Sequence, residues 1–227
     1  MARLFDDAST EYLVVNQVFA TPPFVIACRF RTDLDSTNYL LTIADSASNN
    51  DNFALYLAGV SAGDPIGVSA KGSGVTKTAL SSAGYSLNTW GHATGIFVAN
   101  NDRRAFFEGA NKGTNADTTT PINLDRTTIG VLGRAALTGY MSGMIAEAAI
   151  WDLSVWPGAS DSDKADNFEK ILPSLAKGFT PLHFPLGLKA YWPLIRGLND
   201  SFGGYNLTAN GTVVIAHPRI IQPCGIL

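Results

Sequence analysis

The residues of this sequence that come nearest to an enzyme active site are two carboxylates in the run Tyr140–Asp152. Glu147 and Asp152 are its only acidic residues, and the rest of the run is largely apolar. Glycoside hydrolases cut sugar bonds with a pair of carboxyl groups that flank the scissile bond. In a strand, the odd spacing of Glu147 and Asp152 turns them to opposite faces, and the residues at even spacing are Ala149 and Trp151. We therefore predict no catalytic residue and interpret Glu147 as a structural hydrogen-bond acceptor.

Metal ligation is the next chemistry that the side chains could offer. His92, His183 and His217 lie apart, and none has a second ligand at the spacing of a zinc site. The oxygen-rich segments 45–52 and 100–102 could supply ligands to calcium, but neither has the alternating acids and glycine of a dedicated calcium loop. We interpret both segments as turns and predict no metal site. Calcium remains the one cofactor left open.

Aromatic side chains in loops are the remaining candidates for ligand binding. Trp156 and Tyr85 both lie in turn-rich segments, where a ring could stack on a sugar or enter a pocket of a partner protein. We favour the interpretation that each ring anchors its own loop by local hydrophobic contact, and ligand binding is the alternative. Arg103 and Arg104 form a basic pair near a hairpin tip, which we interpret as a solvated turn.

Composition excludes several classes of protein. Charged residues make up 15% of the chain and the formal net charge is −3, so the basic surface of a nucleic-acid-binding protein is absent and disorder is not expected. No apolar run approaches the length of a membrane helix. The first seven residues do not resemble a secretion signal, so we expect folding in the cytoplasm. Cys28 is expected to be a buried thiol, with a bridge to Cys224 as the alternative.

Short apolar runs separated by turns predict a protein built mainly of β-strands. The run Tyr140–Asp152 has two largely apolar faces, which is typical of a central strand that is covered on both sides. Strict alternation places Met144 and Ala146 on the same face as Ala148 and Ile150. Segment 109–120 is polar and is expected to be a surface loop. Further strands are predicted at 11–15, 24–30, 39–43, 53–57, 65–69, 76–80, 90–99, 104–107, 127–131, 188–192 and 207–215.

The pattern changes once, after residue 160. Front-loaded acidic residues and apolar side chains at helical spacing predict one short helix near 161–172, which Pro173 interrupts. The expected fold is an all-β antiparallel sandwich of jelly-roll type with this single helix. Residues 1–216 would form one domain, and the apolar, Pro-containing segment 217–227 a C-terminal extension or arm.

The order of several weak motifs resembles the concanavalin A-like, laminin-G-like jelly-roll family. The motifs are Phe5–Asp7, Glu11–Val15, Phe24–Arg31, Trp90–His92, Phe107–Gly109, Ile129–Gly130, Gly133–Arg134, Gly143–Trp151, Gly178–Pro181, Ala190–Leu194, Asp200 and Asn206–Thr208. The resemblance implies two stacked, curved sheets in which the last strands lie beside the first. It also implies that Glu147 and Trp151 point away from the inter-sheet core. Ala149 stands where relatives commonly carry a charge, so either the helix and tail or another subunit should cover this face.

Three functions follow from the resemblance and the site residues. The chain is similar to stand-alone laminin-G-like proteins of bacteriophages, which implies a non-enzymatic structural module in the virion. It would decorate a capsid or join a tail, contact other subunits, form a homo-oligomer and use 217–227 as an arm. The alternative is a carbohydrate-binding module that recognises polysaccharide, with or without calcium. A glycoside hydrolase is the most remote reading, because the second carboxylate is missing.

Overall fold

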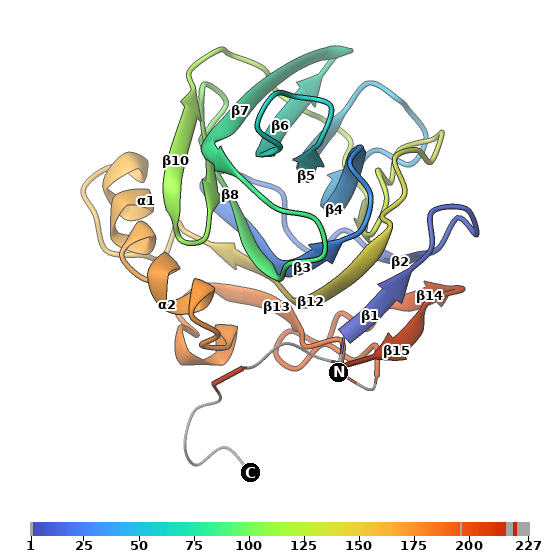
Figure 1. The fold of residues 1–227 in the computed structure, drawn as a ribbon. Coiled ribbons are helices and arrows are strands. Elements are labelled where there is room, and N and C mark those ends of the chain that lie inside the picture. The colour runs from blue at the N-terminus through green and yellow to red at the C-terminus, as the bar shows by residue number, and fades with distance from the viewer. Residues whose placement is uncertain (1, 196, 217–219, 222–227) are drawn as a thin grey trace.

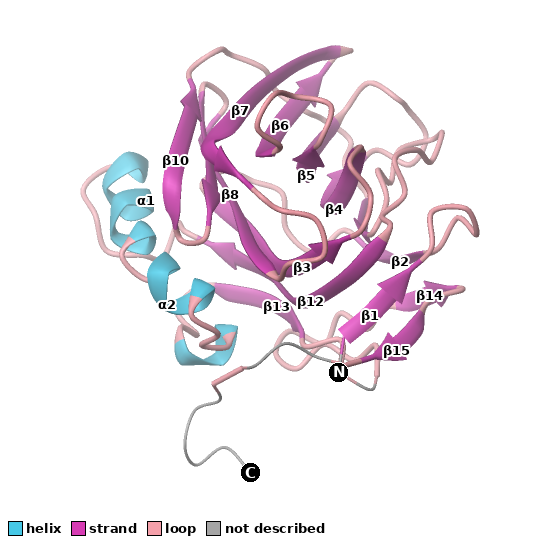
Figure 2. Ribbon diagram, viewed as in Figure 1, coloured by secondary structure: helices cyan, strands magenta, loops and turns pink. Residues whose placement is uncertain are grey.

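Two antiparallel β-sheets stack on each other in the computed structural model, which describes residues 2–195, 197–216 and 220–221 (Figures 1 and 2). In sheet A the order is β10 (Ala110–Asn115), β9 (Asp102–Phe107), β8 (Gly91–Ala99), β3 (Phe24–Thr32), β12 (Gly143–Asp152), β1 (Ala2–Phe5) and β15 (Val213–Ile215), with β13 (Leu188–Trp192) also paired to β12. In sheet B the order is β14 (Thr208–Asn210), β2 (Tyr12–Asn16), β11 (Arg126–Ile129), β4 (Thr37–Ala44), β5 (Asn52–Ala58), β6 (Pro65–Gly72) and β7 (Val75–Gly84). The predicted all-β sandwich is confirmed.

The two ends of the chain meet within the sandwich. β15 pairs with β1 in sheet A, and β14 pairs with β2 in sheet B, which confirms that the last strands lie beside the first. The predicted single strand at 207–215 is therefore two short strands, one in each sheet. The chain crosses between the sheets at the turn that contains Gly211, whose φ is +85°.

The space between the sheets is filled by apolar side chains from alternating strand positions. Phe24 lies at its centre, with its ring centroid 5.0 Å from that of Phe53 and 4.8 Å from that of Phe97. All three rings are at most 4% exposed, and burying each stabilises the fold by about 1.5–3 kcal/mol. This core fixes which face of each strand remains available for other contacts.

A β-bulge in β12 breaks the alternation that the sequence predicts for the central strand. Ala146 pairs with Arg29 and Ala149 pairs with Ala27, so two residues of β12 face one residue of β3. Glu147, with a φ of +53°, is one of these two. Ile145 and Ala148 consequently both point into the inter-sheet core. The prediction that Met144 and Ala146 share a face with Ala148 and Ile150 is wrong because one extra residue shifts the alternation.

Two helices, rather than the predicted one, cover the outer face of sheet A. Helix α1 (Asp161–Glu169) begins with a capping box between Ser160 and Asp163, and α2 (Leu172–Ala176) follows with Pro173 in its first turn. Figure 1 shows both on the same side of the sandwich. A 3₁₀ turn (Pro181–His183) comes next. The predicted helix near 161–172 is confirmed as α1, and Pro173 belongs to a separate short helix because proline has no amide hydrogen to donate within a continuous one.

Beneath the helices lies a second apolar core, separate from the inter-sheet one. Phe168 of α1 is fully buried there against Trp151, with ring centroids 5.3 Å apart, and Ala149 belongs to the same cluster. This arrangement confirms that Trp151 points away from the inter-sheet core. Ala149 is covered by the chain's own helices, which is the first of the two expectations, and not by another subunit.

Two further segments depart from their predictions. β10 forms within 109–120, which was expected to be a loop, and most of its side chains are exposed because it is the outermost strand of sheet A. Of the expected arm 217–227, only residues 220 and 221 are described. Ile221 bridges this chain's own Phe179, donating its amide to the carbonyl of Gly178 over 2.6 Å. Cys28 is a buried free thiol, and Cys224 lies outside the described residues.

Candidate functional site

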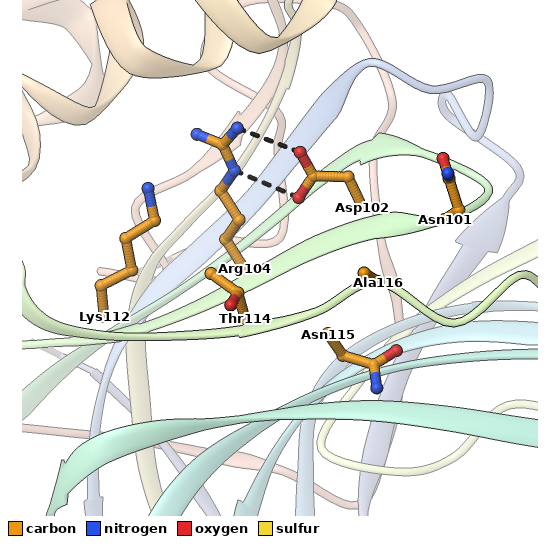
Figure 3. Close-up of a pocket in the computed structure, with 7 residues that line it drawn as sticks. All are labelled: Asn101, Asp102, Arg104, Lys112, Thr114, Asn115 and Ala116. Carbon is orange, nitrogen blue, oxygen red and sulfur yellow. Dashed lines mark hydrogen bonds and ion pairs between the residues drawn. The ribbon is translucent and has the colours of Figure 1, made fainter.

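A surface depression of about 370 Å³ lies where the β8–β9 hairpin and β10 approach helix α1 (Figure 3). Arg104 points from β9 toward the helix and pairs with Asp102 at 3.0 Å, with Asp166 at 2.6 Å and with Glu169 at 2.6 Å. Lys112 of β10 pairs with the same Glu169 at 2.7 Å. The two cations of this depression are thus already bound to three carboxylates, so we assign it a structural role in fixing α1 to sheet A.

This network corrects the interpretation of Arg103 and Arg104 as a solvated turn. The Arg104 side chain is only 6% exposed. Arg103 is 1% exposed and donates to the carbonyls of Asn100 and Asp117 at 2.8 and 2.7 Å, as well as to the Asn115 side chain. Arg103 therefore fixes the hairpin loop at Asn100 to the segment after β10, and Arg104 fixes the hairpin to α1. A sequence pattern misses the pairing of Arg104 with α1 because Asp166 and Glu169 lie more than 60 residues further along the chain.

The two loop aromatics that the sequence singled out are placed differently from one another. Trp156 is half-buried, with its ring 4.9 Å from that of Phe168 and its indole nitrogen donating to the carbonyl of Leu186 at 2.8 Å. Tyr85 is 6% exposed in the inter-sheet core, where burial raises its pKa to about 12. Both rings thus make local anchoring contacts, the reading that the sequence favoured over ligand binding.

The acidic residues of β12 face opposite sides of sheet A, as predicted. Glu147 is 6% exposed on the helix side and accepts a hydrogen bond from the Tyr191 hydroxyl at 2.6 Å. Asp152, 5% exposed, pairs with Lys189 at 3.2 Å. The described residues place no second carboxylate beside Glu147 on this strand. A hydrolytic pair is not formed here.

Among the described residues, no group of three or more His, Cys, Asp or Glu side chains is arranged to hold a metal ion. Asp45 and Asp51, from the segment 45–52, direct carboxylate oxygens at backbone amides. Asp45 accepts from Ala47 at 2.8 Å and Asp51 accepts from Ile122 at 3.1 Å. No helix in the described part of the chain is long and apolar enough to cross a membrane.

The outer face of sheet B, which neither helix covers, presents a set of partly exposed tyrosines. Tyr39 of β4 and Tyr56 of β5 are directly paired, with ring centroids 5.4 Å apart and planes tilted by 33°. Tyr12 of β2 and Tyr140, which follows the turn after β11, form a second pair at 6.4 Å and 51°. We call these four residues the tyrosine row.

Strand alternation and two glycines fix the tyrosine row in place. Tyr56 lies between Leu55 and Leu57, which point into the core, so its ring must point outward. A Cβ on Gly67, its partner on β6, would collide with that ring, so only glycine lets the ring lie across β6. Gly139, with a φ of +63°, makes the same close approach to the Tyr39 ring.

Two hydroxyls of the row, those of Tyr56 and Tyr39, have polar neighbours. Burial raises the pKa of Tyr56, and a side-chain hydrogen bond with Thr78 lowers it in part. Burial also raises the pKa of Tyr39, and the nearby charge of Arg134 lowers it in part. At neutral pH the hydroxyls stay protonated and can donate hydrogen bonds. A shallow depression of about 270 Å³ on the same sheet is lined by Val14, Val15, Asn16, Asn206 and Thr208.

The sequence reasoning missed the tyrosine row, although one signal for it was available. In the strand at 53–57, the large apolar residues Phe53, Leu55 and Leu57 occupy alternate positions. Tyr56 lies between them and is therefore marked as an outward-facing aromatic. Nothing in the sequence pairs it with Tyr39, because that contact depends on the register between β4 and β5.

Two stacked antiparallel sheets, with an aromatic surface on one outer face, define a lectin-like β-sandwich. The chain belongs to the concanavalin A-like lectin/glucanases superfamily, whose laminin-G-like family matches residues 6–156. The resemblance drawn from the motifs is confirmed at this level.

Solved structures share the fold at low sequence identity. A heptameric SAP-like pentraxin from Limulus polyphemus has a TM-score of 0.57 and 12% identity, over 93% of each chain. A candidate carbohydrate-binding protein from Bacteroides ovatus has a TM-score of 0.57 and 16% identity, over 93% of this chain and 58% of that one. Domains LG4-5 of the mouse laminin α1 chain have a TM-score of 0.50 and 14% identity, over 66% of this chain and 40% of that one. No curated protein matches the sequence. None of the proteins named here is a virion protein, so the expected bacteriophage origin has no support from them.

Proposed function

We propose that this chain is a non-catalytic carbohydrate-recognition domain that binds glycans on the outer face of sheet B. The observation that carries the proposal is the tyrosine row, which stands partly exposed on the outer face of sheet B, where the described residues place no helix. Aromatic rings combine a large apolar surface with a polar tip, and this suits the CH-rich face and hydroxyl rim of a sugar. The lectin-like family and the description of the Bacteroides ovatus protein agree with this reading.

The proposal includes the absence of hydrolysis. Glu147 is bonded to Tyr191 beneath the helices, on the other sheet from the tyrosine row. A sugar bound to sheet B is thus separated from that carboxylate by both sheets. Incubation with laminarin-type glucans should release no oligosaccharide. Turnover that disappears in Glu147→Gln would contradict this part of the proposal.

A glycan array and calorimetry on the purified chain test binding directly. Tyr56→Ala and Tyr39→Ala should each lower affinity about three- to tenfold, which corresponds to one aromatic contact. The matched control is Phe202→Ala, which removes an aromatic side chain that is 48% exposed on a loop outside the row. Each measurement is repeated with calcium and with EDTA, because calcium assistance is a separate prediction. Binding that is equal in all three variants and the parent chain would refute the site.

A docking role in a larger assembly is the second candidate function, and one observation favours it. β15 is the last strand of sheet A among the described residues, and its Val213 and Val214 are 52% and 37% exposed. An apolar edge strand is a ready template for pairing with another chain. Light scattering should then give a mass above the 24.1 kDa of one chain, and Val214→Lys should restore the monomer. A monomeric parent chain would count against self-association, and the expected place in a virion stays a prediction.

A further inference from the structure

We propose that the tyrosine row recognises an internal stretch of a soluble, linear polysaccharide, with the sugar chain running across the strands of sheet B. This inference rests on the proposed carbohydrate-binding function and goes further by naming the class of ligand and its direction. It excludes two other ligand classes, the end of a glycan chain and the flat surface of a crystalline polysaccharide.

The direction of the ligand follows from the strand order. Tyr12 lies on β2, Tyr39 on β4 and Tyr56 on β5, and β11 stands between the first two strands. Neighbouring strands lie about 4.8 Å apart, so the row crosses three spacings, or about 14 Å, at a right angle to the strands. A row of that length offers successive contacts to a chain of sugars and is longer than a single sugar ring.

The row is open, which argues against recognition of a chain end. Binding a terminal sugar requires a concave pocket that surrounds it. The depression of about 270 Å³ on this sheet lies beside the row, where Val14 and Thr208 line it, and none of the four tyrosines does. Beyond Tyr56, whose ring lies across Gly67, comes Leu80 of β7, an exposed side chain at which a ligand can continue. Beyond Tyr12 comes its strand partner Asn210, an exposed residue whose side-chain amide nitrogen donates to the Thr10 carbonyl at 3.0 Å, so its amide oxygen is the atom to accept from a sugar hydroxyl.

The tilt of the rings argues against a crystalline surface. A flat array of parallel glycan chains needs aromatic rings that lie in one plane. In the row, the ring planes are tilted by 51° between Tyr12 and Tyr140 and by 33° between Tyr39 and Tyr56. Rings that turn from one contact to the next can follow a flexible chain whose sugars also turn, and cannot all touch a plane together.

Calorimetry with laminari-, xylo- and manno-oligosaccharides of one to six sugars tests the inference. For the series that binds, affinity should rise about three- to tenfold with each further ring contact and level off once the row is spanned. The full-length polysaccharide should bind several copies of the protein per chain. Reduction of the oligosaccharide's terminal aldehyde should leave its affinity unchanged. Protein should stay in solution when mixed with microcrystalline cellulose.

Single-residue variants separate the two ends of the row. Tyr12→Ala should lower affinity for the longest oligosaccharide and leave that for the shortest unchanged, if Tyr39 and Tyr56 bind the short one. Tyr12→Phe keeps the ring and loses only the hydroxyl, so it should weaken binding of the longest oligosaccharide less than Tyr12→Ala does; circular dichroism checks that each variant folds.

The outcomes distinguish this inference from the proposal beneath it. Equal affinity for one and six sugars, or a stoichiometry of one protein per polysaccharide chain, would overturn internal recognition and leave carbohydrate binding intact. Retention on microcrystalline cellulose would overturn the argument from ring tilt. The absence of binding to every probe would overturn the inference and the proposed function together.

Discussion

Acid should destabilise this fold through one buried histidine, His92 on β8. Its side chain is 4% exposed, and its Nδ1 atom has no hydrogen-bond partner among the described residues. Burial, together with the charge of Arg29 on the neighbouring strand, lowers the pKa of His92 from 6.5 to about 3. Below pH 6.5 the unfolded chain therefore binds a proton that the folded chain does not. Stability that is complete above pH 6.5 is lost as the pH falls toward 3.

The size of the effect follows from the pKa difference. One pKa unit corresponds to about 1.4 kcal/mol, so His92 should cost roughly 2–3 kcal/mol of unfolding free energy between about pH 7 and pH 4.5. Glu108 acts in the opposite direction. Burial raises its pKa, although the His92 amide and Arg29 lower it in part, and a carboxyl with a raised pKa adds stability as the pH falls. A His92→Gln variant removes the histidine's contribution and keeps Glu108.

Urea unfolding followed by tryptophan fluorescence at about pH 7, 5.5 and 4.5 measures the effect. Across this pH range, the unfolding free energy of the parent chain should fall by roughly 2–3 kcal/mol more than that of His92→Gln. The control is His183→Gln, which replaces a histidine that is only partly buried. If the parent chain and His92→Gln lose equal stability, the assignment of a neutral, buried imidazole is wrong.

Three further changes test the helix contacts and the tyrosine row. Arg104→Met should lower stability by about 1–3 kcal/mol in urea, less than a fully buried pair, because Asp166 is 57% exposed and can be rehydrated. An unchanged unfolding midpoint would contradict this. Phe168→Ala should lower the unfolding free energy by about 3–5 kcal/mol and make the backbone amides of residues 161–176 exchange faster with solvent. Full protection of these amides would contradict the second core. Gly67→Ala should displace the Tyr56 ring and weaken glycan binding while the chain stays folded, and unchanged affinity would contradict the site.

The strands could be predicted because they depend on local patterns. Alternation and turn residues indicated most of them, and the capped start of α1 was visible in the acidic residues after Ser160. The bulge at Glu147 could not be predicted. A residue with a φ of +53° in the middle of a strand is chosen by the packing of β12 against β3, which no local pattern of apolar residues encodes.

The candidate site was harder to predict, since it depends on the register between neighbouring strands and on which sheet faces the helices cover. Trp156 and Tyr85 were weak candidates because loops commonly carry ligand contacts, and the structure places both rings in the anchoring contacts that the sequence favoured. Tyr39 and Tyr56 were seen as strand residues only. Their value as a pair comes from the alignment of β4 with β5 and from an outer face of sheet B that α1 and α2 leave uncovered. Both are properties of the tertiary structure.

The two outer faces of the sandwich differ in a way that folding alone does not explain. On sheet A, Trp151 is fully buried by the helix that crosses it, so its apolar surface stabilises the fold. On sheet B, Tyr39 and Tyr56 gain a cross-strand contact of about 0.2–1 kcal/mol but leave part of each ring in water. Threonine would suit the same strands and leave less apolar surface exposed. An aromatic pair that is aligned but left uncovered is therefore better explained by a ligand that completes its burial.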